Sequence, residues 1–167
     1  MIGCEADKIA ESLFSKNVHC GDCHKVVIEV AKICMATGKK SLAKKLAEKA
    51  INYCLDSDGY ASEKVWAGHI AEEIGLDKRA NELHKEAVNG FIKDLKDGGL
   101  GQAFSDGESY YFIPDTMIEI AEKFGLREEL LQVALHTYKL AFKEAKKEDE
   151  KKDFKGIIRQ IKRMMKK

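Results

Sequence analysis

Apolar residues recur every three or four positions along most of this chain, and glycines separate many of the apolar segments. This spacing gives a segment one apolar face when it folds as an α-helix, whereas a half-buried strand needs alternation with a period of two. The spacing therefore predicts α-helices along almost the whole chain. The pattern predicts eight helices, at about 6–16, 23–36, 41–55, 62–74, 77–96, 114–124, 128–147 and 154–165.

Three of the glycines are each followed by mostly small residues at offsets of five, nine and twelve. These residues are Ala43, Ala47 and Ala50 after Gly38, Ala80, His84 and Ala87 after Gly75, and Leu130, Ala134 and Thr137 after Gly125. The offsets keep one helix face narrow, so that the preceding helix can lie close against it. Each glycine is then the corner of an antiparallel hairpin, where it ends a helix in the left-handed conformation.

The predicted fold class is all-α, with stacked antiparallel helical hairpins in a single domain over 1–167. N-terminal helices are expected over 6–37, the hairpin stack over 38–142 and a basic amphipathic capping helix over 150–167. The stack is interrupted by one irregular segment, 97–113, which is long for a loop in a compact helical protein.

The glycine pattern resembles the second helix of a tetratricopeptide repeat. Gly68 lies seven residues before Gly75, where that family has a packing glycine or alanine, and Ala31 has the same place before Gly38. The likeness covers 25–142 and is to the broad tetratricopeptide-like superfamily, because the aromatic and leucine signature of the first helix is missing. The resemblance implies a right-handed superhelix or compact α-bundle whose inner face holds a peptide or partner protein.

The irregular segment ends in three consecutive aromatic residues, Tyr110, Tyr111 and Phe112. Long loops on rigid scaffolds often carry recognition, so these side chains are candidates for a partner-binding edge. The alternative is a hydrophobic plug between the second and third hairpins, since exposed aromatic side chains are costly in water.

A cluster of metal-binding residue types, His19, Cys20, Cys23 and His24, occupies the first predicted turn. Two thiolates at this spacing can share a zinc ion or form a disulfide, but a structural zinc site needs a second ligand pair, and Cys4 is the one plausible distant thiol. The same residues match the attachment pattern of c-type haem. That attachment requires export of the protein, and the sequence shows no export signal. An inert cluster, a metal or disulfide site, and redox chemistry all remain open.

His69 and His84 lie six residues before and nine after Gly75, so a hairpin brings them opposite one another. Facing histidines can bind a metal or act as a pH switch, although a buried histidine is more often a packing residue. The Glu-x-x-His motif of di-iron bundles, the nucleophile elbow and the phosphate-binding loop are missing, so no catalytic residue is predicted.

Charge gives no global signal for nucleic acid, because the chain's 29 basic and 28 acidic residues leave a net charge of +1. The basic C-terminal helix is a local candidate for RNA, anionic lipid or an acidic partner, or it covers the end of the stack. The absence of a long apolar run predicts a soluble, cytoplasmic protein, and the Lys- and Glu-rich composition is thermophile-like. The predicted function is a protein-interaction or scaffold module without a cofactor, the alternative being a zinc-binding or redox protein centred on Cys20 and Cys23.

Overall fold

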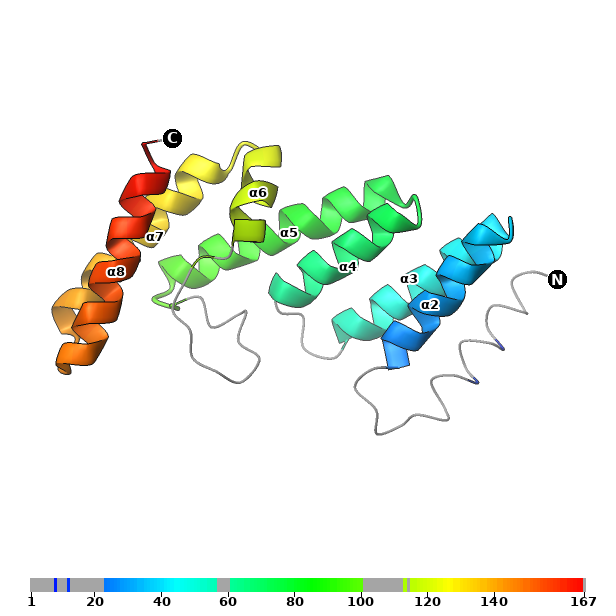
Figure 1. The fold of residues 1–167 in the computed structure, drawn as a ribbon, viewed down its shortest axis with the longest axis horizontal. Coiled ribbons are helices and arrows are strands. Elements are labelled where there is room, and N and C mark those ends of the chain that lie inside the picture. Colours follow the sequence, from blue (N-terminus) through cyan, green and yellow to red (C-terminus); the bar gives the residue numbers. More distant parts are fainter. Residues whose placement is uncertain are drawn as a thin grey trace. The chain divides into compact units, whose positions relative to one another are not determined.

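The computed structural model describes residues 8, 12, 23–56, 61–100, 113 and 115–166. Over these ranges the chain is all-α, with seven helices and no strand (Figure 1). They are α2 (Cys23–Ala36), α3 (Lys40–Asp56), α4 (Ala61–Glu73), α5 (Asp77–Lys96), α6 (Asp115–Lys123), α7 (Arg127–Glu144) and α8 (Glu148–Met164). The predicted fold class is confirmed, and most of the predicted helix at 6–16 lies outside the described residues.

The three predicted corner glycines all adopt the left-handed conformation, with φ of 80° at Gly38, 72° at Gly75 and 68° at Gly125. Each glycine N–H donates to the carbonyl three residues back, and the next N–H donates to the carbonyl five back, as from Leu76 to Ala71 at 2.7 Å. These hydrogen bonds satisfy carbonyl groups at the helix C-terminus that have no hydrogen-bond donor within the helix. The following helix begins two residues after each glycine, which makes the three corners alike.

The narrow faces predicted from the glycine offsets are buried. All nine residues at those offsets are at most 6% exposed, and the eight that are alanine, leucine or histidine are 0% or 1% exposed. On the preceding helices, Ala31 and Gly68 are also buried. The prediction that these positions form the packing face of each hairpin is therefore confirmed. Small side chains there let one helix of a hairpin approach the backbone of the other.

The chain divides into two compact units, and the boundary falls within α5. In the first unit, Met1–His84, α3 packs against both α2 and α4. Trp66 of α4 packs against two apolar clusters, one centred on α2 and α3 and the other on α4 and the start of α5. An ion pair of 2.9 Å between Lys32 and Glu73 also joins α2 to α4.

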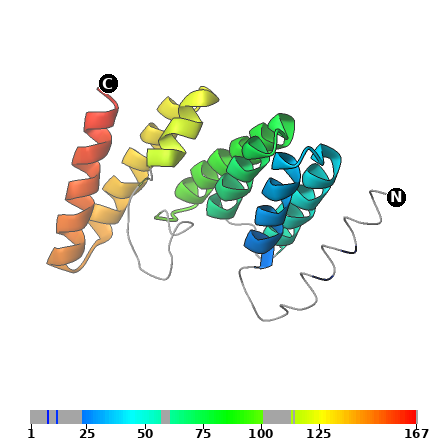
Figure 2. The ribbon, with the colours of Figure 1, turned by 45° about the vertical axis from the view of Figure 1, so that its right-hand side comes forward.

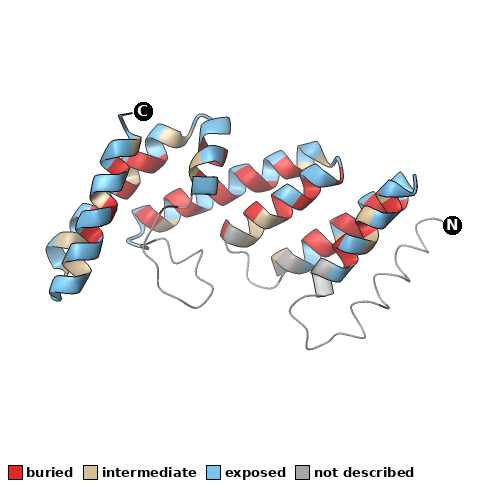
Figure 3. Cartoon of the chain, viewed as in Figure 1, coloured by how far each residue is buried: buried red, intermediate tan, exposed pale blue. Residues whose placement is uncertain are grey.

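In the second unit, Lys85–Lys167, α7 packs against α6 and α8, and α8 returns beside α7 (Figure 2). Tyr138 of α7 is fully buried, and its hydroxyl donates to the carbonyl of Leu100 at 3.0 Å. The buried hydroxyl of Thr137 donates to the carbonyl of Leu95 at 2.7 Å, which ties α7 to the end of α5. Buried positions form stripes along the helices, as expected for amphipathic packing (Figure 3).

Two details differ from the predicted helix bounds in this second unit. Helix α7 ends at Glu144, three residues earlier than predicted, because the backbone of Ala145 is extended (φ −59°, ψ 128°). Helix α8 begins at Glu148, six residues before the predicted start at 154, and its first turn is acidic. The apolar stripe expected for this helix is confirmed by the burial of Phe154, Ile157 and Ile161.

None of the helices in the described ranges has both the length and the apolar character that crossing a bilayer requires.

Candidate functional site

Two of the predicted sites depend on residues outside those that the structure describes. Tyr110, Tyr111 and Phe112 all lie outside them, as do His19 and Cys20. Cys23 and His24 form the start of α2, but their side chains are not among the described ones. Partner binding by the aromatic residues and metal binding by the cysteine motif therefore stay predictions.

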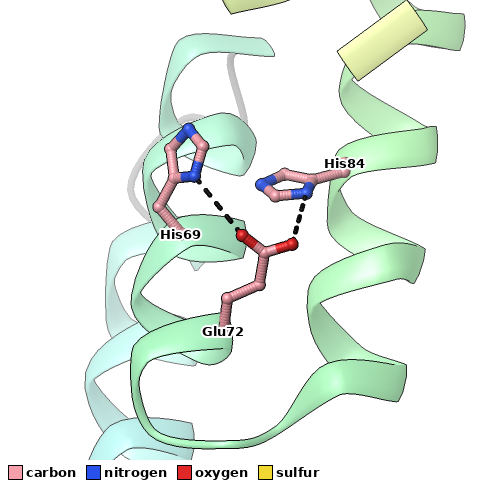
Figure 4. A group of neighbouring side chains, drawn as sticks. All are labelled: His69, Glu72 and His84. Carbon is pink, nitrogen blue, oxygen red and sulfur yellow. Dashed lines mark ion pairs between the residues drawn. The ribbon is translucent and has the colours of Figure 1, made fainter. Parts of the chain in front are cut away.

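Three of the described residues with metal-binding side chains meet in the hairpin formed by α4 and α5. His69 and Glu72 lie one helical turn apart on α4, and His84 faces them from α5 (Figure 4). The Nδ1 atoms of His69 and His84 are each 3.7 Å from a different carboxylate oxygen of Glu72. The two imidazole rings pack edge to face with centroids 4.9 Å apart. The prediction that these histidines lie opposite one another is confirmed.

The three side chains differ sharply in exposure. The side chain of His84 is 1% exposed, with both ring nitrogens buried, whereas those of His69 and Glu72 are 49% and 38% exposed. Gly68 makes the burial of His84 possible, because a β-carbon on that glycine would overlap the imidazole ring. The packing role predicted for Gly68 is thus confirmed, and its packing partner is a polar side chain.

The other two hairpins provide an internal comparison for this cluster. Measured from the corner glycine, its members lie at positions −6, −3 and +9. The same positions hold Lys32, Met35 and Ala47 in the first hairpin, and Glu119, Glu122 and Ala134 in the third. In both of these hairpins an alanine at position +9 is enough for close packing of the two helices. The imidazole of the middle hairpin, which can bind a proton or a metal ion, is therefore not needed for packing at this position.

Sequence reasoning found the two histidines and missed Glu72. The available signal was the spacing of His69 and Glu72, because residues three apart on a helix share one face. The sequence has no Glu-x-x-His motif, but it has the reversed order, His-x-x-Glu, at His69 and Glu72.

A second feature is a recess of about 560 Å³ in the second unit, between the end of α5 and one face of α7. Its lining residues are Leu95, Lys96, Gly98, Leu100, Gln132, Val133, His136, Thr137, Leu140, Ala141 and Glu144. Leu140 is 44% exposed, which is high for a leucine beside a core. An ion pair of 2.8 Å between Lys96 and Glu129 joins the same two helices.

The sequence analysis did not identify this recess. Val133 and Leu140 lie eight and fifteen residues after Gly125 and so fall outside the offsets of the packing face. They form part of a second apolar stripe on α7, which was the available signal.

The fold defines the class of this chain as an all-α protein of paired helices with glycine corners. Comparisons with protein-family models, with curated proteins and with solved structures find no match.

Proposed function

We propose that this protein is a protein-interaction module of the helical-repeat type, and that the recess between α5 and α7 binds a short amphipathic helix of a partner protein. The observation that carries the proposal is the recess itself, whose lining includes apolar side chains and among them the half-exposed Leu140. The resemblance of the glycine pattern to tetratricopeptide-like repeats supports it, because such scaffolds hold peptides or partner proteins.

The shape of the lining favours a helical peptide. Val133, Thr137, Leu140, Ala141 and Glu144 follow one another along α7 at helical spacing. From the first to the last of them, eleven residues at 1.5 Å each span about 16 Å, or roughly three helical turns. A helix bound in a groove presents apolar anchors at positions i, i+3 or i+4, and i+7, which span about 10 Å and so fit within this length.

The chemistry of the lining indicates the energy available. An apolar side chain that becomes fully buried contributes about 1.5–3 kcal/mol. Val133, Leu140 and Ala141 supply apolar surface that is still accessible, whereas Leu95 is already buried. The polar residues Lys96, Gln132, His136 and Glu144 also line the recess. An apolar centre with polar surroundings is the usual anatomy of a protein interface.

The test is selection from a library of amphipathic helical peptides with the full-length protein, followed by fluorescence anisotropy with the selected peptides. Leu140→Arg places a charge in the recess, and it should weaken binding at least tenfold, or about 1.4 kcal/mol. Ile33→Arg is the matched control, because Ile33 is 62% exposed and lies in the other unit. Peptides that bind Leu140→Arg as tightly as the parent protein, or a library that yields no binder, would refute the proposal.

The other predicted functions stay predictions. A metal or redox site at Cys20 and Cys23 depends on side chains outside the described residues. Nucleic-acid binding by α8 requires a basic surface on this helix. The first turn of α8 is acidic, with Glu148, Asp149 and Glu150.

A further inference from the structure

We propose that His69, Glu72 and His84 form a binding site for one divalent transition-metal ion, Zn²⁺, which joins α4 to α5. This inference uses different residues from the recess and does not depend on peptide binding. The site would give the middle hairpin a metal crosslink that the equivalent positions of the first and third hairpins do not provide.

The geometry is the first argument. One ligand atom from each side chain can be chosen so that all three lie within 4.8 Å of one another. A tetrahedral zinc ion with ligand distances of about 2.0–2.1 Å holds its ligand atoms about 3.3 Å apart. The ligand atoms must therefore approach by up to about 1.5 Å. His69 and Glu72 can make this movement by side-chain rotation, because both are partly exposed on α4 (Figure 4).

The ligand types are the second argument. Two neutral imidazoles and one carboxylate are a common ligand set for zinc, and they also suit cobalt and nickel. Three protein ligands leave a fourth position, which water can fill because His69 and Glu72 reach the solvent. Glu72 lies between the Nδ1 atoms of both histidines, so its carboxylate is already placed beside both imidazoles.

The backbone beside His84 is adapted to the buried ring. A glycine at position 68 removes the β-carbon that would overlap the ring, and the ring then lies almost fully buried between α4 and α5. A buried imidazole has little freedom to turn away, which fixes one ligand before the metal arrives. Preorganisation of this kind reduces the ordering that binding requires.

The experiment titrates Zn²⁺, and separately Co²⁺, into the tag-free full-length protein carrying Cys20→Ser and Cys23→Ser. This background removes the predicted thiol ligands of the first turn. We expect one equivalent of Zn²⁺ to bind, as measured by calorimetry. The Co²⁺ complex should show the visible absorption of a four-coordinate site without the charge-transfer bands of thiolate ligands.

Single variants then assign the ligands. His69→Ala and Glu72→Gln change partly exposed side chains, so the fold should persist, which circular dichroism would check. Each should weaken Zn²⁺ binding by at least the 10–100-fold that loss of an outer-shell partner typically costs. His136→Ala and Glu82→Gln are the matched controls, because they change an exposed histidine and an exposed glutamate outside the cluster.

The role of His84 is read without substituting it. Long-range ¹H–¹⁵N spectra of the histidine rings should show that one ring nitrogen of His84 changes its shift at one equivalent of Zn²⁺. Unchanged affinity in both His69→Ala and Glu72→Gln would place the ion elsewhere and overturn the proposal. Loss of all binding in the Cys20→Ser, Cys23→Ser background, with binding retained by the parent, would also overturn it, because these two thiols would then hold the metal.

Discussion

One added methyl group at Gly68 tests how closely α4 approaches the ring of His84. A β-carbon at this position would overlap the Cδ2 and Nε2 atoms of that ring. Gly90, in the middle of α5, offers a matched comparison, because a β-carbon there has no atom within 4 Å. Gly68→Ala and Gly90→Ala thus add the same group to a helix interior and differ in what the group meets.

The expected free energies follow from two opposing effects. Replacing a helix-interior glycine by alanine stabilises the folded state by about 1 kcal/mol. Forcing an extra carbon into a packed core costs about 1–3 kcal/mol. Gly90→Ala should therefore raise the free energy of unfolding by about 1 kcal/mol, while Gly68→Ala should leave it unchanged or lower it by up to about 2 kcal/mol.

A double variant isolates the contact. With His84→Ala in place, the ring is gone, and Gly68→Ala should stabilise by about 1 kcal/mol, as at Gly90. The pair then has the same residues as Ala31 and Ala47, which occupy the equivalent positions in the first hairpin. The expected coupling energy between the two sites is about 1–3 kcal/mol, within the range for residues in contact.

Urea denaturation in the presence of a chelator measures these differences without a contribution from metal. Trp66 is the single tryptophan of the chain and packs in the first unit, so its fluorescence reports the unit that contains Gly68 and His84. Far-UV circular dichroism reports both units. A stabilisation by Gly68→Ala equal to that by Gly90→Ala, with no coupling to His84→Ala, would refute the close approach.

Three further predictions address the remaining contacts. Thr137→Val removes the buried hydroxyl that donates to the carbonyl of Leu95, so it should cost about 1 kcal/mol in urea denaturation, and no loss would contradict the role of that bond. Gly125→Ala forces a β-carbon into a left-handed φ of 68° in otherwise open space, so it should lower the free energy of unfolding by about 1–2 kcal/mol. The hydrogen bond that Lys32 donates to the Glu73 carboxylate is the main cause that raises the pKa of Lys32 above its ordinary value of 10.5. The charged pair therefore stabilises the fold below that pH and loses its effect as the pH rises through the raised pKa. Lys32→Met should cost no more than about 0.5 kcal/mol near neutral pH, and the difference from the parent should vanish in alkaline urea titrations; a difference that persists there would assign the effect to packing.

The sequence predicted the helices best where a glycine ends them. The bounds of α2 and α5 agree with the prediction, because strong apolar periodicity stops at Gly38 and Gly98, which are both left-handed. The end of α7 was placed too late, since neither glycine nor proline follows it and the apolar spacing continues to Ala145. Where no glycine or proline follows a helix, the backbone conformation determines its last residue, and the amino-acid composition does not predict that residue.

The candidate sites were predictable to different degrees for a physical reason. His69 and His84 could be paired from their offsets alone, because a hairpin corner fixes which residues face one another. Glu72 was missed because carboxylates are common on exposed helix faces, and only its direction toward both histidines distinguishes it. The recess was missed because it depends on how α7 approaches the end of α5, a long-range contact that includes the hydrogen bond from Thr137 to Leu95.

The three glycine corners also bear on how the chain folds. Each corner closes through hydrogen bonds between residues at most five apart, so reversal of the chain needs no distant partner. The helices that pack most directly, such as α2 with α3 and α7 with α8, are neighbours in the sequence. Proteins rich in such local contacts fold fast, since little loop-closure entropy opposes them. We therefore expect each hairpin to form as an early kinetic unit.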